Sequence, residues 1–265
     1  MTNKSILSAA ILEQGTIESH AEDEVVNHAV IILASGLSQR LGQSKQLLSK
    51  NGEALICYMT MLALSTQPKT IIVVVPKNRP KISNALSDLS RRNSMIDIVV
   101  NPIPEVGMAH SLYLGIEALT GFDRSLNDTL SSTPINRVLI MGVDQVLLDS
   151  HHLTNLLAGT ETVIASSYQH LNEQYLNKQD LDEPSLDKVA CTEKSKGSII
   201  GLPIVISYEL LKQWQSALIG DKGLRYLIRA LPSNQLSTVN NPQLSYDIDT
   251  PHQLTHAQQQ RWLDS

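Results

Sequence analysis

Residues 29–48 read AVIILASGLSQRLGQSKQLL. The first five residues form an unbroken apolar run, which is typical of a strand that is buried on both faces of a sheet. Residues 34–43 hold Gly36 and Gly42 among small and polar side chains, and this pattern predicts a loop directly after the strand. A loop at the end of a buried strand is also the place where open α/β sheets bind their ligands.

Apolar runs and helical patterns alternate along the rest of the chain. In chain order, the pattern predicts a helix over 53–66, a strand over 71–75, a helix over 79–92, a strand over 97–100, a helix over 109–119, a strand over 138–141, a helix over 150–158, strands over 162–166 and 201–206, a helix over 209–217 and a closing helix. Residues 121–136 are polar and turn-rich, so we expect a surface connection there. Strands that alternate with helices argue for βαβ units. The expected fold class is therefore α/β, with a mostly parallel sheet in a Rossmann-like, three-layer arrangement.

The composition excludes several classes of protein. The chain has 265 residues, of which 42% are hydrophobic and 18% charged, and this is ordinary globular usage. A net charge of −5 and an aromatic content of 4% argue against a basic groove or a stacking platform for nucleic acid. No apolar run approaches the ~20 residues that cross a bilayer, and the two cysteines have neither zinc spacing nor a disulfide pattern. We expect a cytoplasmic protein with no nucleic-acid and no membrane partner.

Two polar stretches interrupt the alternating pattern. Residues 1–27 carry a short apolar segment followed by three acidic residues, and we interpret them as a polar N-terminal extension. Residues 169–197 show no apolar period, and a stretch of about 29 residues is too short to bury a core of its own. We therefore expect a single domain over residues 28–265, with a polar insert at 169–197.

The loop after the first strand has the chemistry of an anion-binding segment. Small residues let the backbone approach a ligand, and backbone amide groups can face phosphate oxygens. Arg40 and Lys45 add two cations to the same segment, as a triphosphate requires. The spacing matches neither the P-loop nor the dinucleotide-binding fingerprint, and taken alone the pattern is also compatible with a solvated turn.

The same segment resembles the signature LAAGxSxRxGxxKxLL of nucleotidyltransferases related to the molybdenum cofactor cytidylyltransferases. In that family the loop wraps a nucleoside triphosphate, and the Arg and Lys of the signature correspond to Arg40 and Lys45. The resemblance also implies that the start of the loop binds the nucleotide, through Leu33, Ala34, Ser35 and Gly36. Ser35 stands where the family usually has Ala or Gly, so an extra hydroxyl falls where the base or ribose is expected to pack.

A second segment, residues 101–115, is similar to the family motif NPxxxxGMxxSLxxG. In the family this loop and helix start contact the base and the acceptor side, which implies nucleotide-binding roles for Gly107 and Ser111. Independently of the family, Gly107 permits a tight turn, and Ser111 falls in the first turn of a predicted helix, where hydroxyl and amide groups can hold an anion. A plain helix cap is the alternative for Ser111.

A carboxylate after the strand over 138–141 predicts one metal ligand. Asp144 lies where open α/β sheets bind ligands, and Mg²⁺ prefers carboxylate and phosphate oxygens. The family motif Asp-Gln-Pro reads Asp144-Gln145-Val146 here, so the proline that stiffens the loop is absent. A helix cap is the alternative role for Asp144.

A second acidic segment, residues 247–251, reads DIDTP and resembles the family's DIDTPxDL. A strand's period of two would point Asp247 and Asp249 to the same side, and motif position favours Asp249 as the partner of Asp144 in a two-carboxylate Mg²⁺ site. A solvated turn before a helix is the alternative. At the family's final Asp this chain has Gln253, which predicts a weakened helix cap.

Three further matches are softer. Tyr168 is similar to the family's Tyr before its acceptor loop, Gly201 and Pro203 to its GxP, and residues 220–223 to its GDxG. The family joins the first two by a short turn, whereas this chain places the polar insert between them.

Together, the motifs imply a GT-A-like nucleotidyltransferase that uses Mg²⁺. The expected reaction moves CMP from CTP onto molybdopterin bearing its molybdenum and releases pyrophosphate, with Lys45, Arg40 and Asp144 as catalytic residues. GTP as the donor and a sugar or polyol phosphate as the acceptor are alternatives. A molybdoenzyme client is left open as a protein partner. A rival from another class is a pterin-binding chaperone without catalysis.

Overall fold

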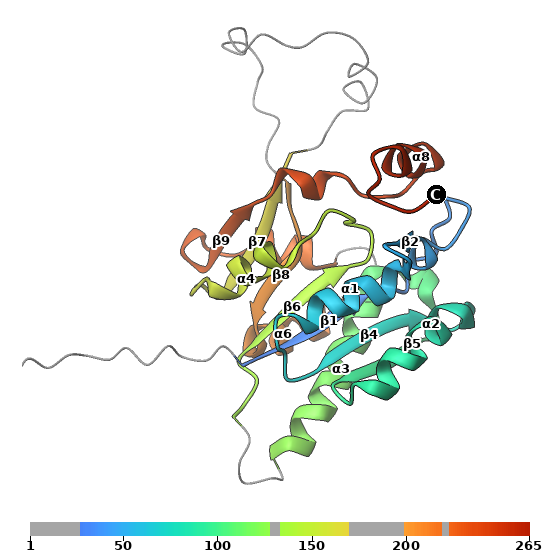
Figure 1. The fold of residues 1–265 in the computed structure, drawn as a ribbon. Helices are drawn as coiled ribbons and strands as arrows, with labels where there is room; N and C mark the ends of the chain where they lie inside the picture. Colours follow the sequence, from blue (N-terminus) through green and yellow to red (C-terminus); the bar gives the residue numbers. More distant parts are fainter. Residues whose placement is uncertain (1–26, 128–132, 170–198, 219–222) are drawn as a thin grey trace, which may run out of the picture.

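The structure, a computed structural model, describes residues 27–127, 133–169, 199–218 and 223–265 (Figure 1). The expected N-terminal extension, except its last residue, and nearly all of the expected polar insert lie outside these residues. Two core clusters, one on each side of a central sheet, hold the described part together.

The central sheet has seven described strands in the order β5-β4-β1-β6-β8-β7-β9. Their bounds are β1 His28–Leu33, β4 Ile71–Pro76, β5 Ile96–Asn101, β6 Arg137–Gly142, β7 Val163–Tyr168, β8 Ile199–Ser207 and β9 Leu236–Asn240. β8 runs antiparallel to both of its neighbours, and the other pairs are parallel. The predicted α/β fold with a mostly parallel sheet is confirmed.

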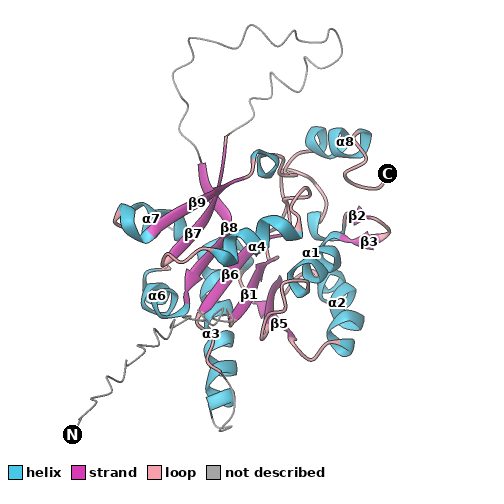
Figure 2. Cartoon of the chain, turned by 60° about the vertical axis from the view of Figure 1, so that its left-hand side comes forward, coloured by secondary structure: helices cyan, strands magenta, loops and turns pink. Residues whose placement is uncertain are grey.

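Helices cover both faces of this sheet (Figure 2). One face packs against α1 Leu55–Leu64, α2 Pro80–Arg92, α4 Ser150–Ala158 and α8 Pro251–Gln259. The other packs against α3 Met108–Asn127, α6 Tyr208–Trp214 and α7 Gly223–Arg229. From Ala29 to Leu33 the side chains of β1 alternate between the two cores, which explains why these five positions are all apolar. No described helix combines the length and the apolarity that a membrane crossing requires.

Close packing of α3 on β1 positions the second sequence motif. Gly115 of this motif lies over β1, where a Cβ atom would come within 2.8 Å of Ile31 Cγ2. The missing side chain lets α3 approach the sheet closely. The first turn of α3, which carries Ser111, is therefore held near the C-terminal end of β1.

The structure corrects the prediction of a surface connection over 121–136. α3 continues to Asn127, so the first part of this polar stretch is helical. A helix that has been nucleated by its buried half can extend through polar residues, because each added residue gains a backbone hydrogen bond.

A short hairpin, with strands β2 Ser49–Lys50 and β3 Glu53–Ala54, was not predicted. Its turn residues Asn51 and Gly52 have φ values of 54° and 80°. Asn-Gly at two successive left-handed positions is the usual signal for a two-residue hairpin turn. The strand β9 and the helix α7 were also not predicted.

Candidate functional site

A cavity of about 610 Å³ opens at the C-terminal ends of β1, β5 and β6. Its walls come from the loop after β1, the loop between β5 and α3, the segment after β6, and Asp249 before α8. Because parallel strands end at the same edge of the sheet, motifs that are far apart in the sequence meet here. The cavity lining includes Leu33, Ser35, Gly36, Arg40, Lys45, Gly107, Ser111, Asp144 and Asp249, which are all of the predicted site residues except Ala34.

The loop after β1 is held by two side chains that the sequence analysis did not single out. Gln46 is fully buried, and its Nε2 donates to the carbonyl oxygens of Ala34 and Gly36 at 2.8 and 2.7 Å. Arg79 donates from outside the loop to the Leu37 carbonyl oxygen at 2.7 Å. Gln46 directly follows Lys45 in a run of polar residues, so the composition of this segment gave no signal that this side chain is buried. Both contacts fix the backbone path of a loop that carries two cations.

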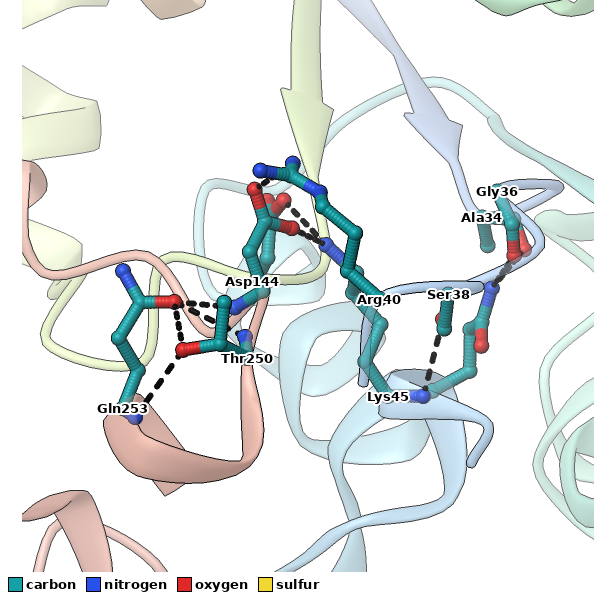
Figure 3. A network of polar contacts seen from close by, with 10 residues as sticks. Ala34, Gly36, Ser38, Arg40, Lys45, Asp144, Thr250 and Gln253 are labelled. Carbon is teal, nitrogen blue, oxygen red and sulfur yellow. Dashed lines mark hydrogen bonds and ion pairs between the residues drawn. The ribbon is translucent and has the colours of Figure 1, made fainter. Parts of the chain in front are cut away.

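Four charged side chains meet on one side of the cavity, and Figure 3 labels three of them, Arg40, Lys45 and Asp144. Lys45 Nζ donates to Asp144 Oδ2 at 2.9 Å and to Asp249 Oδ1 at 2.7 Å. Arg40 Nη2 donates to the other oxygen of Asp249 at 2.5 Å. The Lys45 side chain is 11% exposed and the Arg40 side chain 73% exposed, so Lys45 lies inside the site and Arg40 at its mouth.

The local charges shift the ionisation of this cluster. Burial lowers the pKa of Lys45, but the charges and hydrogen bonds of Asp144 and Asp249 outweigh burial, so its pKa lies above the ordinary 10.5. Burial alone would raise the pKa of Asp249. The hydrogen bonds and positive charges of Lys45 and Arg40 lower it by more, so the pKa of Asp249 lies below the ordinary 3.8. Lys45 is therefore a cation and Asp249 an anion at neutral pH.

Asp247 behaves differently from Asp249. Burial, followed by the negative charges of Asp144 and Asp249, raises the pKa of Asp247 above 3.8. Its backbone pairs with Gln145 in an isolated bridge, which ties the segment before α8 to the segment after β6. Asp249 forms the ion pairs with Lys45 and Arg40, and its assignment as a metal ligand stays a prediction.

The segment after β6 is held without the family's proline. Val146 N donates to the Asp144 carbonyl oxygen at 3.1 Å, and Gln145 Nε2 donates to the Leu202 carbonyl oxygen at 2.7 Å. Lys50 Nζ from the β2–β3 hairpin donates to the Val146 carbonyl oxygen at 2.5 Å. These contacts replace the stiffness that a proline ring supplies.

The helix cap of α8 is intact, so the prediction of a weakened cap was wrong. Thr250 and Gln253 form a capping box, in which each side chain bonds the other residue's backbone N–H. Gln253 Oε1 also accepts from Asp249 N at 2.9 Å. The Gln253 amide oxygen accepts the backbone hydrogen bond of the cap, as a carboxylate oxygen would. It also holds the backbone of Asp249 in place.

On another side of the cavity lies an uncharged cluster of two hydroxyls and an amide. Ser35 Oγ and Ser111 Oγ are 2.5 Å apart, and both side chains are buried. Asn101 Nδ2 donates to Ser111 Oγ at 3.1 Å and reaches Ser35 Oγ at 3.5 Å. Gly107, at φ 106°, makes the turn that brings Ser111 to this cluster, a backbone conformation that favours glycine.

Two softer sequence matches meet at the start of β8. Tyr168 is half-buried, and its hydroxyl lies against Gly201, where a Cβ atom would come within 2.6 Å of the Tyr168 oxygen. The residues of the GDxG match lie mostly outside the described part of the chain.

A family model for the MobA-like NTP transferase domain matches residues 30–236. The chain belongs to this family. The resemblance that the sequence motifs indicated is therefore confirmed, and the protein is a member of the nucleotidyltransferase superfamily.

Solved structures of other proteins, one of which is named a nucleotidyl transferase, share the fold. A nucleotidyl transferase from Methanothermobacter thermautotroptrophicus superposes with a TM-score of 0.62 at 17% identity, over 89% of this chain and 97% of its own. Rv0371c from Mycobacterium tuberculosis, in complex with manganese, gives a TM-score of 0.56 at 16% identity, over 90% of this chain and 99% of its own. At these identities the likeness establishes the fold.

A curated relative is the bifunctional protein GlmU of Corynebacterium aurimucosum. It is 29% identical over 119 residues, which cover 43% of this chain and 24% of that protein. The chain thus matches about a quarter of the length of this relative.

Proposed function

We propose that this protein transfers a nucleoside monophosphate from a nucleoside triphosphate to a phosphate-bearing acceptor and releases pyrophosphate. The observation that carries the proposal is the position of Lys45, whose ammonium group is held by Asp144 and Asp249 inside a cavity of about 610 Å³. The family membership makes a nucleoside triphosphate the expected donor. CTP is the proposed donor and molybdopterin bearing its molybdenum the proposed acceptor, on the strength of the sequence motifs.

The donor set fits a divalent cation. Oxygens of Asp144 and Asp249 already converge on one cation, the Lys45 ammonium group, at 2.9 and 2.7 Å. Within the described residues no three His, Cys, Asp or Glu side chains form a metal-binding group, so two carboxylates would hold the ion together with nucleotide phosphates. Mg²⁺ commonly accepts this kind of ligand set. The manganese complex of Rv0371c supports a divalent ion in a protein of the same fold.

The proposed reaction is an in-line displacement. An oxygen of the acceptor phosphate forms a bond to the α-phosphorus, the bond from that phosphorus to the bridging oxygen breaks, and pyrophosphate leaves with the electron pair. Asp144 and Asp249 would hold Mg²⁺, which would neutralise negative charge on the α-phosphate. No protein base is required, because a phosphate acceptor is already ionised.

The chain's own cations have separate tasks in this proposal. Lys45 remains protonated because its pKa is raised, and it lies deep enough to stabilise charge on the transferring phosphate. Arg40 is mostly exposed at the mouth of the site, where it can hold the departing pyrophosphate and release it. Gln46 fixes the backbone at Ala34 and Gly36, and the nucleotide binds along this start of the loop, where Ser35 and Gly36 line the cavity.

GTP is the alternative donor, and a sugar phosphate or polyol phosphate is the alternative acceptor. A molybdoenzyme is the proposed protein client. The rival is a cofactor chaperone without catalysis. Retention of Lys45, Asp144 and Asp249 in one ion-paired cluster favours the enzyme, since a binding protein has no need of this arrangement.

The experiment is a pyrophosphate-release assay with CTP, GTP, ATP and UTP in turn, each with Mg²⁺ and with molybdopterin, molybdenum cofactor and sugar or polyol phosphates as acceptors. We expect acceptor-dependent release with CTP as the best donor. Absence of release with every combination, together with tight binding of the pterin, would favour the chaperone.

A further inference from the structure

A bulge in β8 brings Leu202 to the cavity. The register of the β7–β8 pair shifts at this point, so Leu202 and Pro203 have no pairing partner among the described residues of β7. The pairing of β8 with β6 reaches only as far as Ile204. Extra residues in one strand re-aim the side chains at that place, and Leu202 lines the cavity together with Asp144.

Two side chains bond the backbone carbonyl groups of this bulge. Gln145 Nε2 donates to the Leu202 carbonyl oxygen at 2.7 Å, and Ser166 Oγ donates to the Pro203 carbonyl oxygen at 2.7 Å. Gln145 directly follows Asp144, so the first bond ties the bulge to the segment that carries this carboxylate. Ser166 is fully buried, and a buried carbonyl that loses its donor is destabilising. The second bond therefore fixes the path of the bulge from the β7 side.

His152 on α4 completes a chain of hydrogen bonds to the bulge. Its Nε2 lies 2.8 Å from Ser166 Oγ, and both side chains are buried. The Pro203 carbonyl oxygen can only accept, so it takes the Ser166 hydroxyl hydrogen, and Ser166 Oγ accepts from His152. If Ser166 donated to His152 instead, two oxygen lone pairs would face each other at 2.7 Å. Neither side chain belongs to the cavity lining that the described residues form, so a ligand does not compete for these hydrogens.

Leu202 lies on the side of the carboxylates that is away from the loop after β1. The strand order is β1, β6, β8, with that loop after β1, Asp144 after β6 and Leu202 on β8. In an in-line displacement the acceptor and the departing pyrophosphate lie on opposite sides of the α-phosphorus. If the triphosphate binds along the loop after β1, the acceptor arrives on the β8 side and contacts Leu202.

We propose that His152 and Ser166 are positioning residues for the acceptor. They act through the Pro203 carbonyl oxygen on the bulge, and the bulge sets where Leu202 lies in the cavity. Leu202 is apolar, so it packs against the part of the acceptor beside the phosphate without forming a side-chain hydrogen bond. This inference rests on the proposed transfer reaction and adds two residues outside the cavity that set the affinity for its acceptor.

The test is steady-state pyrophosphate release with Mg²⁺, in which the KM of CTP and the KM of the acceptor are measured separately. The acceptor is molybdopterin bearing its molybdenum, or the sugar or polyol phosphate that gives faster release by the wild type. Ser166→Ala removes the donor to the Pro203 carbonyl, and His152→Leu removes the donor to Ser166. We expect each variant to raise the KM of the acceptor about tenfold, the order of one lost hydrogen bond at a buried site, and to leave the KM of CTP within about twofold of the wild-type value.

Two further variants separate positioning from a general loss of stability. His152→Gln keeps an N–H donor toward Ser166 and should recover most of the wild-type KM of the acceptor. The double variant of Ser166→Ala and His152→Leu should resemble Ser166→Ala alone, because His152 acts through Ser166. A loss of folded protein alone would lower kcat and leave both KM values unchanged.

Ser167→Ala, at the next residue of β7, and His151→Leu, at an exposed neighbour on α4, are the matched controls and should keep both wild-type KM values. An unchanged KM of the acceptor in either Ser166→Ala or His152→Leu overturns the inference, and so does an equal rise in the KM of CTP. Absence of release by the wild type contradicts the proposed function and the inference with it. Release by the wild type with an unchanged KM of the acceptor in the variants contradicts the inference alone.

Discussion

At the scale of single residues, the site depends on how one lysine is held. The Lys45 ammonium group is bonded to carboxylates that are far apart in the sequence, Asp144 after β6 and Asp249 before α8. A flexible lysine is fixed in this way inside the cavity before any nucleotide arrives. Preorganised charge of this kind is the main source of stabilisation for a transferring phosphate.

Replacing Lys45 with Ala should lower the rate of pyrophosphate release by about two to three orders of magnitude, the range seen when one preorganised charge-stabilising group is removed. The measurement is the single-turnover rate with saturating donor and acceptor. Lys81→Ala, an exposed lysine on α2, is the matched control and should behave as the wild type. Equal rates for Lys45→Ala and Lys81→Ala would remove Lys45 from the catalytic set.

A second prediction at this scale concerns Asp247. Its pKa is raised in the folded protein, by burial first and then by Asp144 and Asp249, so its charged form destabilises the fold at neutral pH. Asp247→Asn should therefore raise the free energy of unfolding at pH 7 without divalent ions. The destabilisation is complete above the folded pKa and disappears below the ordinary value of 3.8, so the difference from wild type should shrink as the pH falls toward that value.

Urea unfolding of wild type and Asp247→Asn between pH 7 and pH 4 measures this difference. Asp97→Asn, at an exposed carboxylate on β5, is the control for the removal of one negative charge. A variant that is less stable than wild type at pH 7 would show that Asp247 is favourably paired instead.

At the scale of elements, the β2–β3 hairpin connects the C-terminal end of the chain to one segment of the site. Lys50 on β2 donates to the Val146 carbonyl oxygen, two residues after Asp144. Asp264 near the C terminus accepts from Ser49 Oγ and from the backbone N–H groups of Asn51 and Gly52. Figure 1 shows α8 and the C terminus beside β2, in agreement with these bonds. The hairpin therefore links the end of the chain to the segment that carries Asp144.

Replacing Lys50 with Met should lower the free energy of unfolding by about 1–3 kcal/mol, because the buried Val146 carbonyl loses its donor. It should also raise the Mg²⁺ concentration needed for half-maximal pyrophosphate release, since Asp144 is held less firmly. Lys50→Arg keeps a donor and should recover part of both losses, and Lys69→Met at an exposed site is the control. An unchanged Mg²⁺ requirement in Lys50→Met would confine Lys50 to a structural role.

Some helices and strands could be predicted from the sequence and others could not. The strands β1 and β4 were predictable because strands buried on both faces of a sheet are apolar along almost their whole length. β9 is an edge strand with no buried residue, so it lacks this pattern. The prediction that the α8 cap is weakened was wrong because it assumed that the cap needs a carboxylate at position 253. The amide oxygen of Gln253 accepts the same backbone hydrogen bond.

The site was predictable to a similar extent. Lys45, Asp144 and Asp249 follow from motifs, and the sheet topology explains why they meet. The supporting contacts of Gln46, Arg79 and Lys50 were not predictable, because they depend on the path of the loops in space.

At the scale of the whole molecule, both cores share one sheet, and we infer that residues 28–265 form a single domain. Neighbouring residues of β1 belong to opposite cores, Ile31 to that of α3 and Ile32 to that of α1. A substitution that destabilises either core therefore also destabilises β1, which both cores share.

Ile31→Ala and Ile32→Ala should each lower the free energy of unfolding by about 2–5 kcal/mol, the usual loss for such a truncation at a buried site. Both variants should unfold in one transition by circular dichroism and by tryptophan fluorescence, as a single cooperative domain does. Two separate transitions, one changed by each substitution, would divide the chain into two units.

The net charge of −5 is compatible with the binding of a polyanionic nucleotide. An acidic chain binds a polyanion only if its cations are placed locally, and Arg40 and Lys45 meet that need within one cavity. Carboxylates of the same site supply binding for a divalent ion in the proposed reaction, so the acidic balance and nucleotide binding are compatible.

The most direct test of the central claim is the acceptor-dependent release of pyrophosphate from CTP by wild type and by Asp144→Ala, measured over a range of Mg²⁺ concentrations. Asp149→Ala, five residues further along and at the cap of α4, is the control for a nearby carboxylate outside the cavity. The account predicts Mg²⁺-dependent release by the wild type and a loss of orders of magnitude in Asp144→Ala. Release by Asp144→Ala at the wild-type rate and with the wild-type Mg²⁺ dependence would contradict it.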